Sequence, residues 1–108
     1  MEKNVLLTII HASEDIDIIA EKIKKEKTVE KCKSHLAKCI DTAFSIENFL
    51  LNTSALIESK HIINDIIEDF RIAQNSKSID EIHSKMRSCI YANSIIYAKL
   101  IELYKKYY

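Results

Sequence analysis

The absence of two residue types restricts the folds open to this chain more than any motif does. Its 108 residues include no glycine and no proline. Glycine supplies the positive φ angles of tight turns, and proline ends helices and central strands. A β-sandwich or a β-barrel needs many such turns, so the composition predicts an all-α protein.

Apolar residues recur at alternating steps of three and four along four separate runs, which is the period of a buried helix face. The runs cover 5–23, 29–50, 56–73 and 79–107, and the first consists of Val5, Ile9, Ala12, Ile16, Ile19 and Ile23. The step between runs is six residues, which in an unbroken helix would move the apolar face about a third of a turn off its line. We therefore expect chain reversals near Lys27, Thr53 and Lys77.

Residues beside these breaks agree with helix ends. Thr28 and Ser78 are good N-caps, and Ser78 forms a capping box with Glu81. Asn52 and Asn75 are the expected left-handed residues after the second and third helices. Short turns make neighbouring helices antiparallel, so the sequence predicts an up-and-down four-helix bundle, one domain over 1–108. A continuous helix through 24–27, giving three long helices, is the alternative.

Charge and cysteine content narrow the possible partners and the compartment. Sixteen Lys and Arg balance sixteen Asp and Glu, and hydrophobic residues make up 47% of the chain. This composition is typical of a folded, soluble protein, and it lacks the basic field that nucleic acid or an anionic membrane would attract. Three cysteines without close pairing, and no signal segment, favour a reduced cytoplasmic protein. We expect no cofactor.

Five cysteine and histidine residues are predicted to gather toward one end of the bundle. Cys39 and Cys89 each lie eleven residues beyond a predicted N-cap, and Cys32, His35 and His83 lie about two turns nearer that end. A soft-metal or redox site is one interpretation. The other is that the cysteines are small core hydrophobes.

The segment His35-Leu36-Ala37-Lys38 has the His-x-x-Lys spacing of histidine phosphotransfer domains, and the predicted bundle also resembles them. The resemblance covers this window and the architecture. It implies a phosphocarrier in which His35 accepts the phosphoryl group and Lys38 helps to hold it. The glycine that usually follows the lysine is Cys39 here, and the small residues that let a response regulator approach are missing.

Asn93 is an amide on an otherwise apolar run, so it must find a hydrogen-bond partner or face water. In coiled coils one such asparagine sets register and oligomeric state. Apolar residues beside the runs, such as Ile18 and Ile40, widen the helix faces enough for self-association. We therefore expect a non-catalytic protein–protein interaction module, such as an adaptor, inhibitor, immunity protein or assembly subunit, that binds a protein partner or itself as a homo-oligomer.

Overall fold

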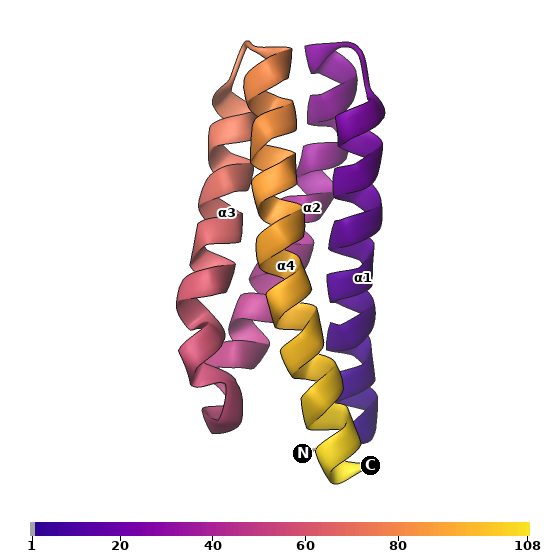
Figure 1. Ribbon diagram of the computed structural model, residues 1–108, viewed down its shortest axis with the longest axis vertical. Coiled ribbons are helices and arrows are strands. Elements are labelled where there is room, and N and C mark those ends of the chain that lie inside the picture. The colour runs from indigo at the N-terminus through magenta and orange to yellow at the C-terminus, as the bar shows by residue number, and fades with distance from the viewer. Residues whose placement is uncertain (1) are drawn as a thin grey trace.

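Three reversals divide the chain into four α-helices, as the spacing of the apolar runs predicts. The computed structural model describes residues 2–108, the side chain of Ala55 excepted. Its helices are α1 (Lys3–Lys25), α2 (Val29–Leu51), α3 (Lys60–Asn75) and α4 (Ile79–Tyr107), with a short 3-10 helix, η1 (Ser54–Ser59), before α3. α1 and α3 each pack against both α2 and α4, which gives an antiparallel up-and-down bundle (Figure 1). The three-helix alternative is therefore wrong.

The predicted N-caps form at the beginnings of α2 and α4, but the capping box of α4 forms only in part, because the Ser78 N–H donates to Ser76 Oγ at 3.1 Å. Thr28 Oγ1 accepts a hydrogen bond from the backbone N–H of Lys31 at 3.3 Å, and Ser78 Oγ accepts one from Glu81 at 3.2 Å. Each bond satisfies an amide that the first helical turn leaves without a partner. These two caps fix where α2 and α4 start.

The ends of α2 and α3 differ from the prediction. No non-glycine residue of the described part of the chain has a positive φ, so Asn52 and Asn75 do not adopt the left-handed conformation. After α3 the chain becomes extended at Ser76, whereas after α2 Asn52 keeps a φ of −100° and the chain becomes extended one residue later, at Thr53. An extended residue leads the chain away from the helix axis without the steric cost of a positive φ.

The core runs along the bundle axis, and on α1 it includes every second member of the predicted run, namely Ile9, Ile16 and Ile23, while each of the other three members is replaced by the next residue. Leu6, Ser13 and Ala20 are buried, whereas Val5 is 45% exposed, and Ala12 and Ile19 are only partly buried. The inward face therefore follows a second series with the same spacing, namely Leu6, Ile9, Ser13, Ile16, Ala20 and Ile23.

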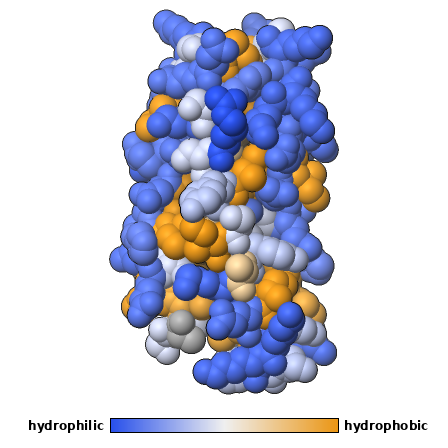
Figure 2. Space-filling view, viewed as in Figure 1, coloured by the Kyte–Doolittle hydropathy of each residue, from blue (hydrophilic) through white to orange (hydrophobic). Residues whose placement is uncertain are grey.

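The surface is mainly hydrophilic but retains several large apolar side chains. Figure 2 shows this mixture on the face over α4, where hydrophobic patches lie between polar ones. The exposed large hydrophobic residues are Val5, Ile18, Phe44, Leu51, Ile57, Tyr91, Tyr107 and Tyr108. No helix in the described part of the chain has the length and apolar content needed to cross a bilayer.

Candidate functional site

Two buried polar residues join the first helix to the last. Ser13 on α1 is 0% exposed and Asn93 on α4 is 2% exposed. The Ser13 hydroxyl donates to Asn93 Oδ1 at 2.9 Å, and Asn93 Nδ2 donates to the Ser13 carbonyl at 2.9 Å. Each residue thus satisfies the other, as buried polar groups require. The amide that the sequence singled out has its partner within the chain.

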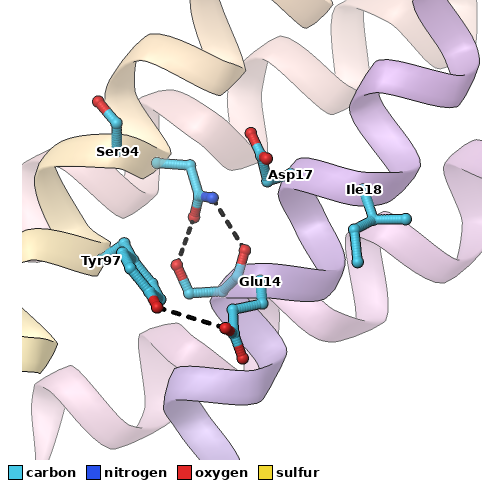
Figure 3. Close-up of a pocket in the computed structure, with 7 residues that line it drawn as sticks. Glu14, Asp17, Ile18, Ser94 and Tyr97 are labelled. Atoms are coloured by element: carbon cyan, nitrogen blue, oxygen red, sulfur yellow. Dashed lines mark hydrogen bonds between the residues drawn. The ribbon is translucent and has the colours of Figure 1, made fainter.

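The Ser13–Asn93 pair forms the floor of a pocket that opens between α1 and α4. Its volume is about 390 Å³, and its lining residues are Ser13, Glu14, Asp17 and Ile18 from α1 with Asn93, Ser94 and Tyr97 from α4 (Figure 3). The lining holds two carboxylates and no lysine or arginine. It is therefore an acidic pocket over a fixed polar floor.

Tyr97 and Glu14 lie toward each other across the two helices (Figure 3). The Tyr97 hydroxyl donates to Glu14 Oε2 at 3.3 Å, and the other oxygen, Oε1, lies 2.8 Å from His11 Nδ1. Desolvation and the adjacent Glu14 carboxylate raise the pKa of Tyr97, so the phenol remains a hydrogen-bond donor at neutral pH. Glu14 is thus held in place on both sides.

Asp17 and Ile18 form the more open part of the rim. Asp17 is exposed, and no ion pair in residues 2–108 involves it. Ile18 is 53% exposed beside it. Ser94, by contrast, donates its hydroxyl to the Tyr91 carbonyl of its own helix at 2.6 Å. A carboxylate beside an apolar side chain is the part of the pocket that a ligand would meet first.

Comparison with protein-family models, with curated proteins and with solved structures found no match to this chain.

The five predicted metal ligands do not form one site. No group of three or more His, Cys, Asp or Glu residues within 2–108 is placed to hold a metal ion. Cys32 Sγ instead donates to the Ile23 carbonyl at 3.6 Å, and His83 Nε2 lies 2.9 Å from the Glu26 carbonyl. Both residues contact the end of α1 and the turn after it, from two different helices.

All three cysteines are free and buried. Burial raises the pKa of the Cys39 thiol to about 12. Burial is also the main cause of a raised pKa at Cys89, with smaller contributions from Cys39, Asp69 and Asp17. The thiolate is the form that binds metals and attacks electrophiles, and these thiols keep their protons at neutral pH. They pack as small apolar side chains.

The two residues of the phosphotransfer window are both on α2. His35 is half-buried, and Lys38, about one turn further along, is exposed. The phosphocarrier alternative stays a prediction.

The pocket was only partly visible in the sequence. Asn93 was predicted to need a partner, but Ser13 was missed because the first apolar run was placed through Val5 and Ala12. The series Leu6, Ile9, Ser13, Ile16, Ala20 and Ile23 has the same alternating steps and one polar member. One polar residue in each of two otherwise apolar series is the signal that could have predicted the contact between Ser13 and Asn93. Whether Asn93 also sets an oligomeric state concerns contacts between chains, and that role stays a prediction.

Proposed function

We propose that this chain is a non-catalytic helical interaction module that binds a protein partner at the pocket between α1 and α4. The observation that carries the proposal is the rim, where Asp17 and Glu14 lie beside the exposed Ile18 with no cation in the lining. A lysine or arginine of the partner would fit it. The long stems of these residues pack on apolar surface while their charged ends reach carboxylates.

The rigid floor supports this proposal. Ser13 and Asn93 hold α1 and α4 in a fixed register, and Tyr97 holds Glu14. A partner side chain would therefore meet groups that already have their positions, and preorganisation reduces the ordering cost of binding. Tyr97 adds an aromatic surface of the kind enriched in protein interfaces.

A matched pair of variants tests the site. Asp17→Asn removes a rim charge, whereas Asp15→Asn makes the same change two residues away on α1, outside the pocket lining. We expect a partner captured from the native host to be lost with Asp17→Asn and with Ile18→Ser, at a cost of about tenfold or more in Kd, and retained with Asp15→Asn. Equal retention by all three variants would remove the pocket as the binding site.

A direct probe needs no knowledge of the partner. Arginine amide and citrulline amide have nearly the same shape, but only the first carries a charge. We expect arginine amide, titrated into labelled protein, to shift the backbone amide resonances of Glu14, Asp17 and Tyr97, and citrulline amide to leave them in place. Identical shifts with both compounds would contradict recognition of a cation.

A further inference from the structure

A second seam, which is only partly exposed, follows α2 along its length beside the buried one. The buried seam consists of Cys32, Leu36, Cys39, Ala43, Ile46 and Leu50. Each member is followed by a residue of a parallel series, here called the flanking seam: Lys33, Ala37, Ile40, Phe44, Glu47 and Leu51. Its steps also alternate between four and three, so it forms a straight stripe on the helix. Phe44 is 39% exposed and Leu51 is 45% exposed on this stripe.

The flanking seam is self-complementary. Ile40 lies at its centre, and Lys33 and Glu47 lie seven positions to either side, roughly 10 Å along the helix axis. If a second α2 packs antiparallel on the first about a two-fold axis beside Ile40, Lys33 of each copy meets Glu47 of the other. A parallel arrangement would instead place lysine against lysine and glutamate against glutamate, which is unfavourable.

Side-chain size and available charge fit the same arrangement. The antiparallel alignment places Phe44 of one copy over the Ala37 region of the other, where a small residue leaves room for an aromatic ring. Lys33 and Glu47 are each half-buried, and within residues 2–108 neither takes part in an ion pair. Both are therefore available for a contact between chains.

We propose that two copies of this chain associate through their α2 flanking seams as an antiparallel, two-fold symmetric dimer. Such an interface uses the same patch on both copies, which is how most two-fold dimers are built. The surface is on a different part of the bundle from the α1–α4 pocket, so this inference goes beyond the proposed function and rests on separate residues.

Charge exchange at the seam distinguishes a second copy from any other occupant. Light scattering over a concentration series should show a dimer for the wild type. Lys33→Glu and Glu47→Lys should each weaken the dimer roughly tenfold or more, because like charges then meet twice per dimer. The double variant Lys33→Glu/Glu47→Lys restores opposite charges across the two-fold axis and should restore the dimer.

Two further variants complete the test. Phe44→Ser/Leu51→Ser should give a monomer with unchanged helical circular dichroism, since both side chains are exposed. Tyr91→Ser, which removes the exposed aromatic of α4, should leave the dimer intact. A monomeric wild type would overturn the proposal and leave the seam to a different protein. A double charge variant that stays as weak as the single ones would also overturn it, because the contacts of Lys33 with Glu47 between copies would then be absent.

Discussion

The contact between Ser13 and Asn93 shows how two polar residues can lie inside an apolar bundle. Either residue alone would leave buried donors and acceptors without partners, at a cost of about 1–3 kcal/mol. Together they exchange two hydrogen bonds of 2.9 Å. The pair therefore contributes little net stability but strongly penalises any other alignment of α1 against α4.

Substitutions at this pair should be strongly non-additive. Asn93→Leu should lower the free energy of unfolding by about 1–3 kcal/mol, because it leaves Ser13 buried and unpaired. Adding Ser13→Ala should recover most of that loss, since both partners are then apolar. Urea unfolding measures both effects, with Ser94→Ala as a neighbouring control within about 0.5 kcal/mol of wild type. Additive losses would show that the pair is not coupled, and light scattering on Asn93→Leu tests its predicted role in oligomeric state.

The buried thiols should make stability depend on alkaline pH. A thiol in the unfolded chain ionises near its ordinary pKa of 9.0, whereas folded Cys39 has a pKa of about 12. The folded state therefore holds more protons between these values, and stability, complete below about pH 9, falls as pH rises through this window, by about 1.4 kcal/mol per pH unit for each such thiol.

Urea unfolding at about pH 8 and about pH 10 tests this dependence. Cys39→Ala/Cys89→Ala should flatten the decline, because the two strongly shifted thiols are gone. Cys32→Ala keeps both of those thiols and should retain most of the decline. Equal slopes in all three proteins would attribute the pH dependence to other groups.

At the scale of elements, the turn between α1 and α2 is stabilised by side chains of α2 and α4. It contains neither glycine nor asparagine, yet α1 ends at Lys25 and α2 begins at Val29. His83 on α4 contacts the Glu26 carbonyl, and Cys32 on α2 donates to the Ile23 carbonyl. Carbonyls at the end of a helix lack partners within it, so distant side chains stabilise this reversal.

Replacing His83 should loosen this turn. His83→Phe removes the contact with the Glu26 carbonyl and should cost about 0.5–1.5 kcal/mol of stability. It should also speed amide hydrogen exchange around residues 23–28. His35→Phe is the matched control, because His35 on α2 is half-buried like His83. No hydrogen bond described for residues 2–108 joins the His35 side chain to this turn. Similar exchange rates in both variants would contradict the assignment.

At the scale of the whole molecule, helix number and direction were predictable, because four apolar runs separated by steps of six leave few ways to bury them. The rotation of each helix about its own axis was less predictable. Adjacent apolar pairs such as Val5–Leu6 and Ile19–Ala20 offer alternative inward positions about 100° apart, and the sequence does not distinguish them. The pocket depends on that rotation in two helices at once, so only its Asn93 side was foreseen.

The Ser13–Asn93 bond joins positions 80 residues apart. During synthesis, α1, α2 and α3 can emerge and pack against one another before α4 is available. The side of the pocket formed by Asn93, Ser94 and Tyr97 is then still missing. A nascent chain therefore has no complete pocket until α4 has left the ribosome and docked, and the partner binding proposed for this pocket would be confined to chains that have finished folding.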